Sequence, residues 1–202
     1  MTSRARLALA TLLAVSLFGI IVGNASANRL SINETRFRIV WNRLTFNEET
    51  AEARDVCPVT MEGSFHSGTI RKVLGALIGH VTRAAAGACT GGGLTILRET
   101  LPWHVTYEGF FGTLPRITGL LILLRNIAWQ ERIVSPLGEM TCLIRLVRAL
   151  FIVPVIAETG QLESVEAEQR ERFSCGLLTE HLSGTGTITR QESAERIVIR
   201  LI

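Results

Sequence analysis

Apolar and polar residues alternate along several short stretches of this chain. In the clearest stretch, Trp103, Val105 and Tyr107 alternate with His104 and Thr106. A period of two places successive side chains on opposite faces of a strand, so the pattern predicts a half-buried β-strand. Aromatic and β-branched residues suit such a strand. We therefore expect a β core in which this strand is central.

Two earlier segments alternate in the same way. The apolar face of one is predicted to consist of Cys57, Val59, Met61, Gly63 and Phe65, and its polar face of Thr60, Glu62, Ser64 and His66. The other begins at Phe37, and its alternation changes phase between Trp41 and Leu44. One extra residue inserted into a strand produces such a change, so we expect a β-bulge there.

The segment 69–83 fits two structures. It carries an apolar stripe at helical spacing, but Gly75 and Gly79 oppose a helix, because each costs about 1 kcal/mol in a helix interior. We expect a turn or short helix around Ile70–Leu74, followed by a strand near Leu77–Ala86.

Two later segments are also ambiguous. Residues 117–129 are the most apolar part of the chain after the N-terminal region, and they fit either a strand covered on both faces or a buried helix. We favour the strand, because the neighbouring segments are predicted strands. Residues 160–173 are polar and rich in charge, which is typical of a loop or an exposed helix.

These strands recur at roughly 8–12-residue spacing and are separated by turns marked with glycine, a pattern typical of sandwiches and barrels. Residues 177–182 and 185–190 are expected to form one further pair of strands around Ser183-Gly184. We predict an all-β fold, a single antiparallel β-sandwich or partly closed β-barrel of about 8–10 strands with one short helix as an option.

The N-terminus has the features of a secretory signal peptide. Two arginines precede the apolar run Leu7–Val22, and Ala25-Ser26-Ala27 matches a cleavage pattern. The alternative, an uncleaved membrane anchor, needs about 20 apolar residues, and the run provides only about 16. We expect residues 1–27 to be removed and residues 28–202 to form one secreted β-domain, extracellular or in the cell envelope.

Removal of that segment changes the charge balance. Basic residues fall from 21 to 19 against 18 acidic residues, which leaves a net charge of +1. Such a chain has no strong electrostatic field, so nucleic acid and anionic lipid are not expected as main partners. A cell-envelope component or a small apolar ligand remains open as the partner.

All four cysteines lie in the predicted mature chain, where an oxidising compartment favours two disulfides. Three connectivities are possible, and the spacing favours Cys57–Cys89 and Cys142–Cys175. Each pairing closes a loop of about 33–34 residues and is expected to stabilise the fold by about 3–4 kcal/mol. The chain has no C-x-x-C sequence, the usual mark of redox catalysis or of a compact zinc site.

Candidate chemistry is sparse. His66 and His104 lie on the polar faces of predicted strands, near Glu62 and Glu108, and could hold zinc if the strands were neighbours. Ser64 with such a histidine and Glu62 could form a hydrolytic triad, but the nucleophile-elbow pattern is absent. We favour surface histidines and predict no catalytic residue, no metal site and no cofactor.

Two other features have an ordinary structural interpretation. Gly91-Gly92-Gly93 lacks both common phosphate-binding glycine patterns, so a flexible turn is expected there. Trp103 and Tyr107 could line a ligand pocket, but core packing is the expected role of both.

Two sequence stretches carry a family resemblance. They are Cys57-Pro58-Val59-Thr60-Met61-Glu62-Gly63-Ser64-Phe65-His66 and Leu101-Pro102-Trp103-His104-Val105-Thr106-Tyr107, followed by Gly112-Thr113-Leu114-Pro115. Over residues 57–119 the chain resembles a group of uncharacterised secreted bacterial proteins. The resemblance implies export and a β-rich domain with paired cysteines, and it transfers no activity or functional residue.

The sequence thus predicts a non-enzymatic structural or binding module of the envelope or extracellular space. Two alternatives stay open, a barrel that carries a small apolar ligand and a hydrolase. An open apolar lumen would favour the carrier. Clustering of Glu62, His66, His104 and Glu108 in a cleft would favour the enzyme.

Overall fold

The structure, a computed structural model, describes residues 29–48, 54–135, 138–168, 173–175 and 178–202. The predicted signal peptide lies outside the described residues, as does the Pro136-Leu137 part of an expected turn. Within the described residues every regular element is a strand except a short 3-10 helix, Arg98–Thr100.

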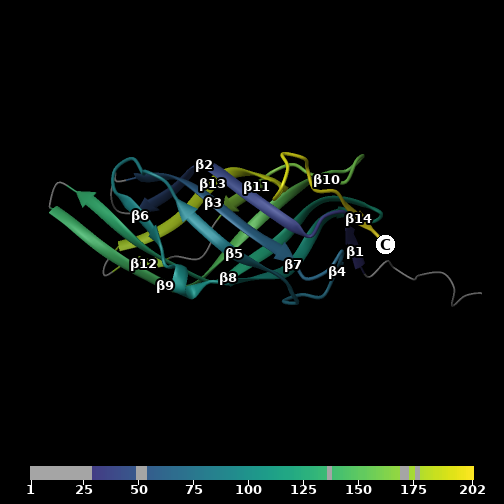
Figure 1. Ribbon diagram of the computed structural model, residues 1–202, viewed down its shortest axis with the longest axis horizontal. Helices are drawn as coiled ribbons and strands as arrows, with labels where there is room; N and C mark the ends of the chain where they lie inside the picture. The colour runs from purple at the N-terminus through teal and green to yellow at the C-terminus, as the bar shows by residue number, and fades with distance from the viewer. Residues whose placement is uncertain (1–28, 49–53, 136–137, 169–172, 176–177) are drawn as a thin grey trace, which may run out of the picture.

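The main body is a closed antiparallel barrel. Its strands are β2 (Arg36–Glu48), β3 (Arg54–Phe65), β5 (Leu77–Ala86), β7 (Trp103–Thr113), β8 (Arg116–Ser135), β9 (Gly138–Ile156), β11 (Val165–Glu168) and β13 (Leu178–Arg190). In the described part of the chain these eight strands pair in the order β9-β11-β13-β2-β3-β5-β7-β8, and pairing of β8 with β9 closes the ring (Figure 1). The all-β prediction is confirmed, and of the two predicted architectures the barrel is the one that forms.

Six shorter strands complete the molecule. They are β1 (Arg29–Ile32), β4 (Thr69–Arg71), β6 (Gly93–Ile96), β10 (Gln161–Leu162), β12 (Phe173–Cys175) and β14 (Ile199–Leu201). The first, second and last of these form a small sheet in the order β14-β1-β4 at one end of the barrel, where the C-terminus also lies (Figure 1). The β8–β9 hairpin extends beyond the opposite end, and β6 pairs with it there.

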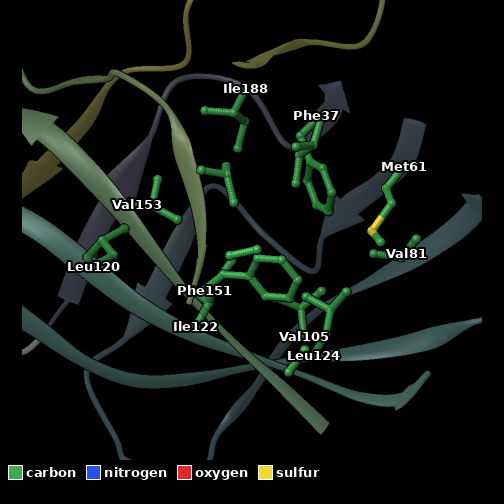
Figure 2. Close-up of a cluster of buried hydrophobic side chains, with 14 of the residues drawn as sticks. Phe37, Met61, Val81, Val105, Leu120, Ile122, Leu124, Phe151, Val153 and Ile188 are labelled. Carbon is green, nitrogen blue, oxygen red and sulfur yellow. The ribbon is translucent and has the colours of Figure 1, made fainter. Parts of the chain in front are cut away.

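Alternation along the strands fills the barrel with apolar side chains. Figure 2 shows side chains from opposite walls meeting around Phe151, among them Met61, Val105 and Ile188. Trp41 and Trp103 are completely buried, and Trp41 packs against Phe151 with 5.7 Å between ring centroids. An eight-stranded barrel is just wide enough for side chains to fill. Here they fill it, because aromatic side chains from several strands occupy the axis.

A very small void lies inside the barrel. Among the described residues, a space of about 20 Å³ lies between side chains that include Val59, Trp103 and Phe151. That volume holds about one water molecule, whereas small-molecule pockets measure about 300–1,000 Å³. The predicted core role of Trp103 and Tyr107 is confirmed, since the two are 0% and 4% exposed.

One predicted irregularity is confirmed, and the prediction for a second segment holds in part. The β2–β3 register shifts between Trp41 and Leu44, where the sequence predicts a bulge. In the ambiguous segment the expected strand forms over Leu77–Ala86. The turn or short helix expected around Ile70–Leu74 does not begin at Ile70, which lies in β4, and the turn comes later, at Leu74-Gly75.

Two predictions near the C-terminus are wrong. The polar segment 160–173 is expected to be a loop or exposed helix, but it contains β10 and the barrel strand β11, in which Val165 and Ala167 are buried. The predicted pair of strands around Ser183-Gly184 is one strand, β13, with a register shift between Ser183 and Thr187. In both places the apolar residues are too few or too irregularly spaced to identify the strand from the sequence. They become buried only when neighbouring strands of the barrel pair with the segment.

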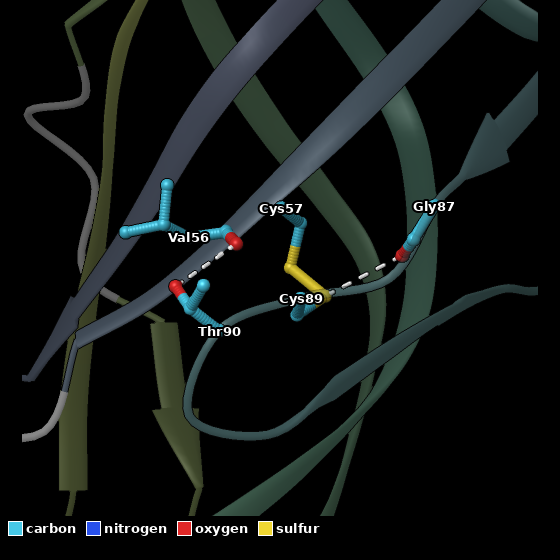
Figure 3. Close-up of a disulfide and its surroundings, with 5 residues drawn as sticks. All are labelled: Val56, Cys57, Gly87, Cys89 and Thr90. Atoms are coloured by element: carbon cyan, nitrogen blue, oxygen red, sulfur yellow. Dashed lines mark hydrogen bonds between the residues drawn. A yellow bond between two sulfur atoms is a disulfide. The ribbon is translucent and has the colours of Figure 1, made fainter.

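A disulfide joins Cys57 on β3 to Cys89 in the connection between β5 and β6, with 4.2 Å between the Cα atoms (Figure 3). The Val56 and Thr90 backbones exchange hydrogen bonds of 3.0 and 3.3 Å beside it. The Cys57–Cys89 prediction is confirmed. Cys142 is also disulfide-bonded, and the side chain of its predicted partner, Cys175, lies outside the described part of the chain.

Close packing of β3 against β5 requires a glycine at position 63. A Cβ atom there would lie 2.2 Å from the carbonyl oxygen of His80 and 2.7 Å from the Phe37 ring. We therefore predict that Gly63→Ala lowers the free energy of unfolding by about 1–3 kcal/mol, the usual cost of overpacking. Urea denaturation measures this change. Gly68→Ala is the control, since its Cβ would meet only the Ile32 carbonyl at 3.5 Å, and an equal loss in both variants would contradict the prediction.

Candidate functional site on the outer wall of the barrel

A groove of about 670 Å³ runs along the outside of the barrel over β2, β3 and β5. The 3-10 helix borders it through Arg98, and Leu101 follows in the same connection. Its lining comprises Arg38, Thr60, Glu62, Thr82, Arg83, Ala84, Ala85, Arg98 and Leu101. The groove is therefore open and lined by charged and apolar side chains together, whereas the barrel interior is apolar.

A bulge in β5 places two polar side chains of the groove next to each other. Val81 and Ala84 are buried, while Thr82 and Arg83 between them are both exposed. The β3–β5 register shifts at this point, so that Glu62 pairs with Arg83 and Gly63 with Val81. An extra residue on one strand produces this arrangement.

Glu62 is held by two arginines from neighbouring strands. Its Oε1 lies 3.0 Å from Arg38 Nε, and its Oε2 lies 3.5 Å from Arg83 Nη1. The amide of Gln191 also donates to Oε2 at 3.3 Å. The Glu62 side chain is 14% exposed and the Arg83 side chain 78%, so the carboxylate is largely covered while the guanidinium faces solvent. With Arg98 the groove carries three positive charges and one negative charge.

Three histidines lie side by side just beyond the groove. His66 follows β3, His80 is on β5, and His104 is on β7, where His80 and His104 are direct cross-strand partners. His66 Nε2 and His80 Nδ1 are 3.0 Å apart. Ring centroids are separated by 4.7 Å for His66 and His80 and by 5.2 Å for His80 and His104. Burial, together with the charges of its two neighbours, lowers the pKa of His80, which keeps its ring neutral at physiological pH.

In the structure His66 and His104 lie on the two sides of His80. Their predicted acidic partners, Glu62 and Glu108, form ion pairs with arginines instead. Glu108 accepts hydrogen bonds from Thr106 Oγ1 at 2.9 Å and from Arg125 Nη2 at 3.4 Å. Glu62 is occupied by the contacts described above. Across the described residues, no group of three or more His, Cys, Asp or Glu side chains is placed to hold a metal ion together.

Ser64 and the glycine run also take structural positions. Ser64 lies on the regular part of β3 and is the cross-strand partner of His80, which is not the sharp turn that a nucleophilic serine occupies. Gly92 packs closely against β8 and β3, where only a glycine fits. A Cβ atom there would lie 2.0 Å from the Arg132 carbonyl oxygen and 2.3 Å from Asp55 Oδ2.

Sequence reasoning missed Arg38, Arg83 and His80 as members of this surface. His80 and Arg83 lie in the segment whose helical and strand patterns compete, so their face is unknown until the strand is established. The consecutive polar residues Thr82 and Arg83 between Val81 and Ala84 are the one signal of the bulge. Arg38 is visible as an outward residue of β2, but its neighbour Glu62 depends on the β2–β3 register.

A second titratable cluster lies inside the molecule. Asp55 and Glu131 are 7% and 3% exposed, and hydrogen bonding between their side chains holds the pKa of Asp55 down while its burial raises it. Burial dominates, so the pKa of Asp55 lies above its ordinary value of 3.8. Arg132 also acts against the rise through its charge. Asp55 therefore loses its proton at a higher pH in the folded protein than in the unfolded chain.

This pair makes a prediction about pH. A carboxyl group whose pKa is higher in the folded than in the unfolded state binds more protons when folded, so stability falls as pH rises through that interval. We predict that Asp55→Asn removes part of this dependence. Thermal melts at increasing pH from the ordinary value of 3.8 upward should show the wild-type Tm falling more than the Asp55→Asn Tm, while the exposed-site variant Glu163→Gln follows the wild type. Parallel curves for wild type and Asp55→Asn would contradict the prediction.

The described part of the chain contains no helix that is long and apolar enough to cross a membrane. Comparisons of the chain with protein-family models, with curated proteins and with solved structures gave no match.

Proposed function

We propose that this protein is a secreted, non-enzymatic binding module that recognises an acidic ligand on the outer wall of a solid barrel. The observation that carries the proposal is the contrast between the two surfaces of the wall. On the inside, the space beside Trp103 and Phe151 measures about 20 Å³, whereas the outside holds an open groove of about 670 Å³. The signal-peptide pattern and the Cys57–Cys89 disulfide support export, because disulfides persist in oxidising compartments.

The charges of the groove support an acidic ligand. Arg38 and Arg83 share a single carboxylate, that of Glu62, and Arg98 borders the groove on its other side. Within the described residues no ion pair joins Arg98 to an acidic side chain. Arginine binds carboxylates with two parallel hydrogen bonds, so an extended polymer of uronic acids fits the groove. Such a polymer falls within the class of cell-envelope components, the partner class that the sequence leaves open.

The filled interior argues against the carrier alternative and leads to a prediction. We expect the exported protein, purified from its own host, to show the mass of the trimmed chain alone in native mass spectrometry. An apolar ligand of ordinary size would have to displace side chains such as Phe151 and Trp103, which are at most 1% exposed. A stoichiometric apolar adduct would contradict the filled-barrel interpretation and restore the carrier.

Binding to alginate tests the proposed function directly. The wild-type protein should bind this polyuronate but not neutral dextran, and added salt should weaken the binding. The double variant Arg83→Gln/Arg98→Gln should bind alginate at least about tenfold more weakly, a loss of about 1.4 kcal/mol. The matched control is Arg71→Gln/Arg200→Gln, which removes two exposed arginines from the small terminal sheet.

Two results would overturn the proposal. One is equal alginate affinity for the groove variant and the control variant. The other is equal binding of alginate and dextran by the wild type.

A further inference from the structure

The His66–His80 pair is the most unusual feature of the outer wall. Two ring nitrogens, His66 Nε2 and His80 Nδ1, face each other at 3.0 Å on the solvent side of the barrel. In this contact one imidazole donates its N–H to the lone pair of the other. The contact therefore already aligns two nitrogens of the type that binds late transition metals.

We propose that His66 and His80 together chelate a divalent late transition metal, with Cu²⁺ bound most tightly, at a site separate from the arginine groove. The ligand atoms are the two nitrogens that now face each other. The imidazole that donates the hydrogen bond takes the tautomer with its hydrogen on the other ring nitrogen, so both lone pairs become available without net loss of a proton. Water completes the coordination.

If the two nitrogens keep their present spacing, it sets the angle between the two bonds to the metal. With metal–nitrogen bonds of about 2.0–2.1 Å, a separation of 3.0 Å corresponds to an N–metal–N angle of about 90–97°. Tetrahedral coordination would require a separation of about 3.3–3.4 Å. An angle near 90° is that of square-planar or tetragonal coordination, which Cu²⁺ and Ni²⁺ prefer, and affinity for a given nitrogen site generally rises from Ni²⁺ to Cu²⁺.

The surroundings of the two histidines allow their rings to rotate and can accommodate the positive charge of a metal ion. To aim both lone pairs at one metal ion, each ring must turn by about 45° from the present line between the nitrogens. His66 is exposed and His80 is half-buried, so both rings have access to solvent. Three arginines on this part of the wall are paired with acids, Arg83 with Glu62, Arg125 with Glu108 and Arg36 with Glu192. These ion pairs reduce the repulsion that a bound cation would meet.

His104 defines the limit of the site. It contacts His80 on the side away from His66, edge to face, with 5.2 Å between the ring centroids. Because no three-residue group in the described chain is placed to hold a metal, we assign binding to the two facing nitrogens alone. His104 then acts as a packing neighbour of His80.

Metal titration of the untagged mature protein tests the assignment. Calorimetry with Cu²⁺, Ni²⁺ and Zn²⁺ at slightly alkaline pH should show one Cu²⁺ site, weaker Ni²⁺ binding and the weakest binding for Zn²⁺. His66→Ala and His80→Ala should each weaken Cu²⁺ binding at least about tenfold. His181→Ala is the matched control, since it removes the remaining histidine, on β13, and should leave the affinity unchanged. His104→Ala should change it by less than about threefold.

Electron paramagnetic resonance of the Cu²⁺ complex supplies the second readout. The wild-type spectrum should show coupling to two imidazole nitrogens. His66→Ala and His80→Ala should each lose this two-nitrogen coupling while keeping the wild-type circular dichroism. Unchanged Cu²⁺ affinity in folded His66→Ala and His80→Ala, or tighter binding of Zn²⁺ than of Cu²⁺, would overturn the proposal. Alginate binding does not enter this test, so either proposal can fail without the other.

Discussion

Trp103→Ala is expected to lower the free energy of unfolding by about 3–5 kcal/mol, the largest loss predicted for any single substitution here. Trp103 is completely buried at the start of β7, and its indole Nε1 donates to Thr100 Oγ1 at 2.9 Å. Its removal enlarges an existing void, because Trp103 lines the space of about 20 Å³ in the barrel. The loss combines the free energy that burial of the indole no longer contributes with the cost of the cavity left behind.

Urea denaturation followed by circular dichroism measures this loss. Trp103→Phe should retain most of the stability, since it keeps an aromatic ring and loses only the hydrogen bond and part of the volume. Phe111→Ala is the surface control, because Phe111 is 43% exposed, and it should cost less than about 1 kcal/mol. A loss below about 1 kcal/mol for Trp103→Ala would show that Trp103 does not support the core as described.

The second large effect is expected from the disulfide. The double substitution Cys57→Ala/Cys89→Ala should lower the free energy of unfolding by about 3–4 kcal/mol, because the bond joins residues 32 positions apart and restricts the unfolded chain. Domains are typically stable by about 5–15 kcal/mol, so this change is a large fraction of the total. The native fold should persist, since backbone hydrogen bonds between Val56 and Thr90 hold the same segments together.

The comparison is made in the absence of reductant, between the wild type and the double variant. Replacing both cysteines avoids leaving a reactive thiol. Amide hydrogen exchange adds a local readout, in which Thr90 and its neighbours should exchange faster than in the wild type while the centre of β7 changes less. An unchanged denaturation midpoint would contradict the prediction.

Several outcomes follow from local pattern alone. Alternation assigned the inward face of β3 from Cys57 to Phe65, the strand that begins at Trp103, and the bulge between Trp41 and Leu44. These assignments succeed because a strand side chain points inward or outward according to its own position in the pleat. Where many successive residues obey the period, neighbouring strands are not needed to identify the strand.

Other outcomes depended on neighbours. The strand β11 has only four residues, and Val165 and Ala167 become a buried face only when β9 and β13 pair with it on either side. The expected loop or exposed helix at residues 160–173 was wrong for this reason. A short segment in a charged environment carries too little periodic signal to be assigned alone.

The candidate site shows the same division. Residue alternation was enough to place Glu62 and His104 on the outward faces of β3 and β7, and His66 on the outward side directly after β3, since it fixes the side of a strand on which each residue lies. The assembled barrel was needed to show that β5 lies between those strands, that His80 comes within 3.0 Å of His66, and that arginines occupy both glutamates. The physical reason is that strand order and register arise from closure of the whole barrel, which no single segment encodes.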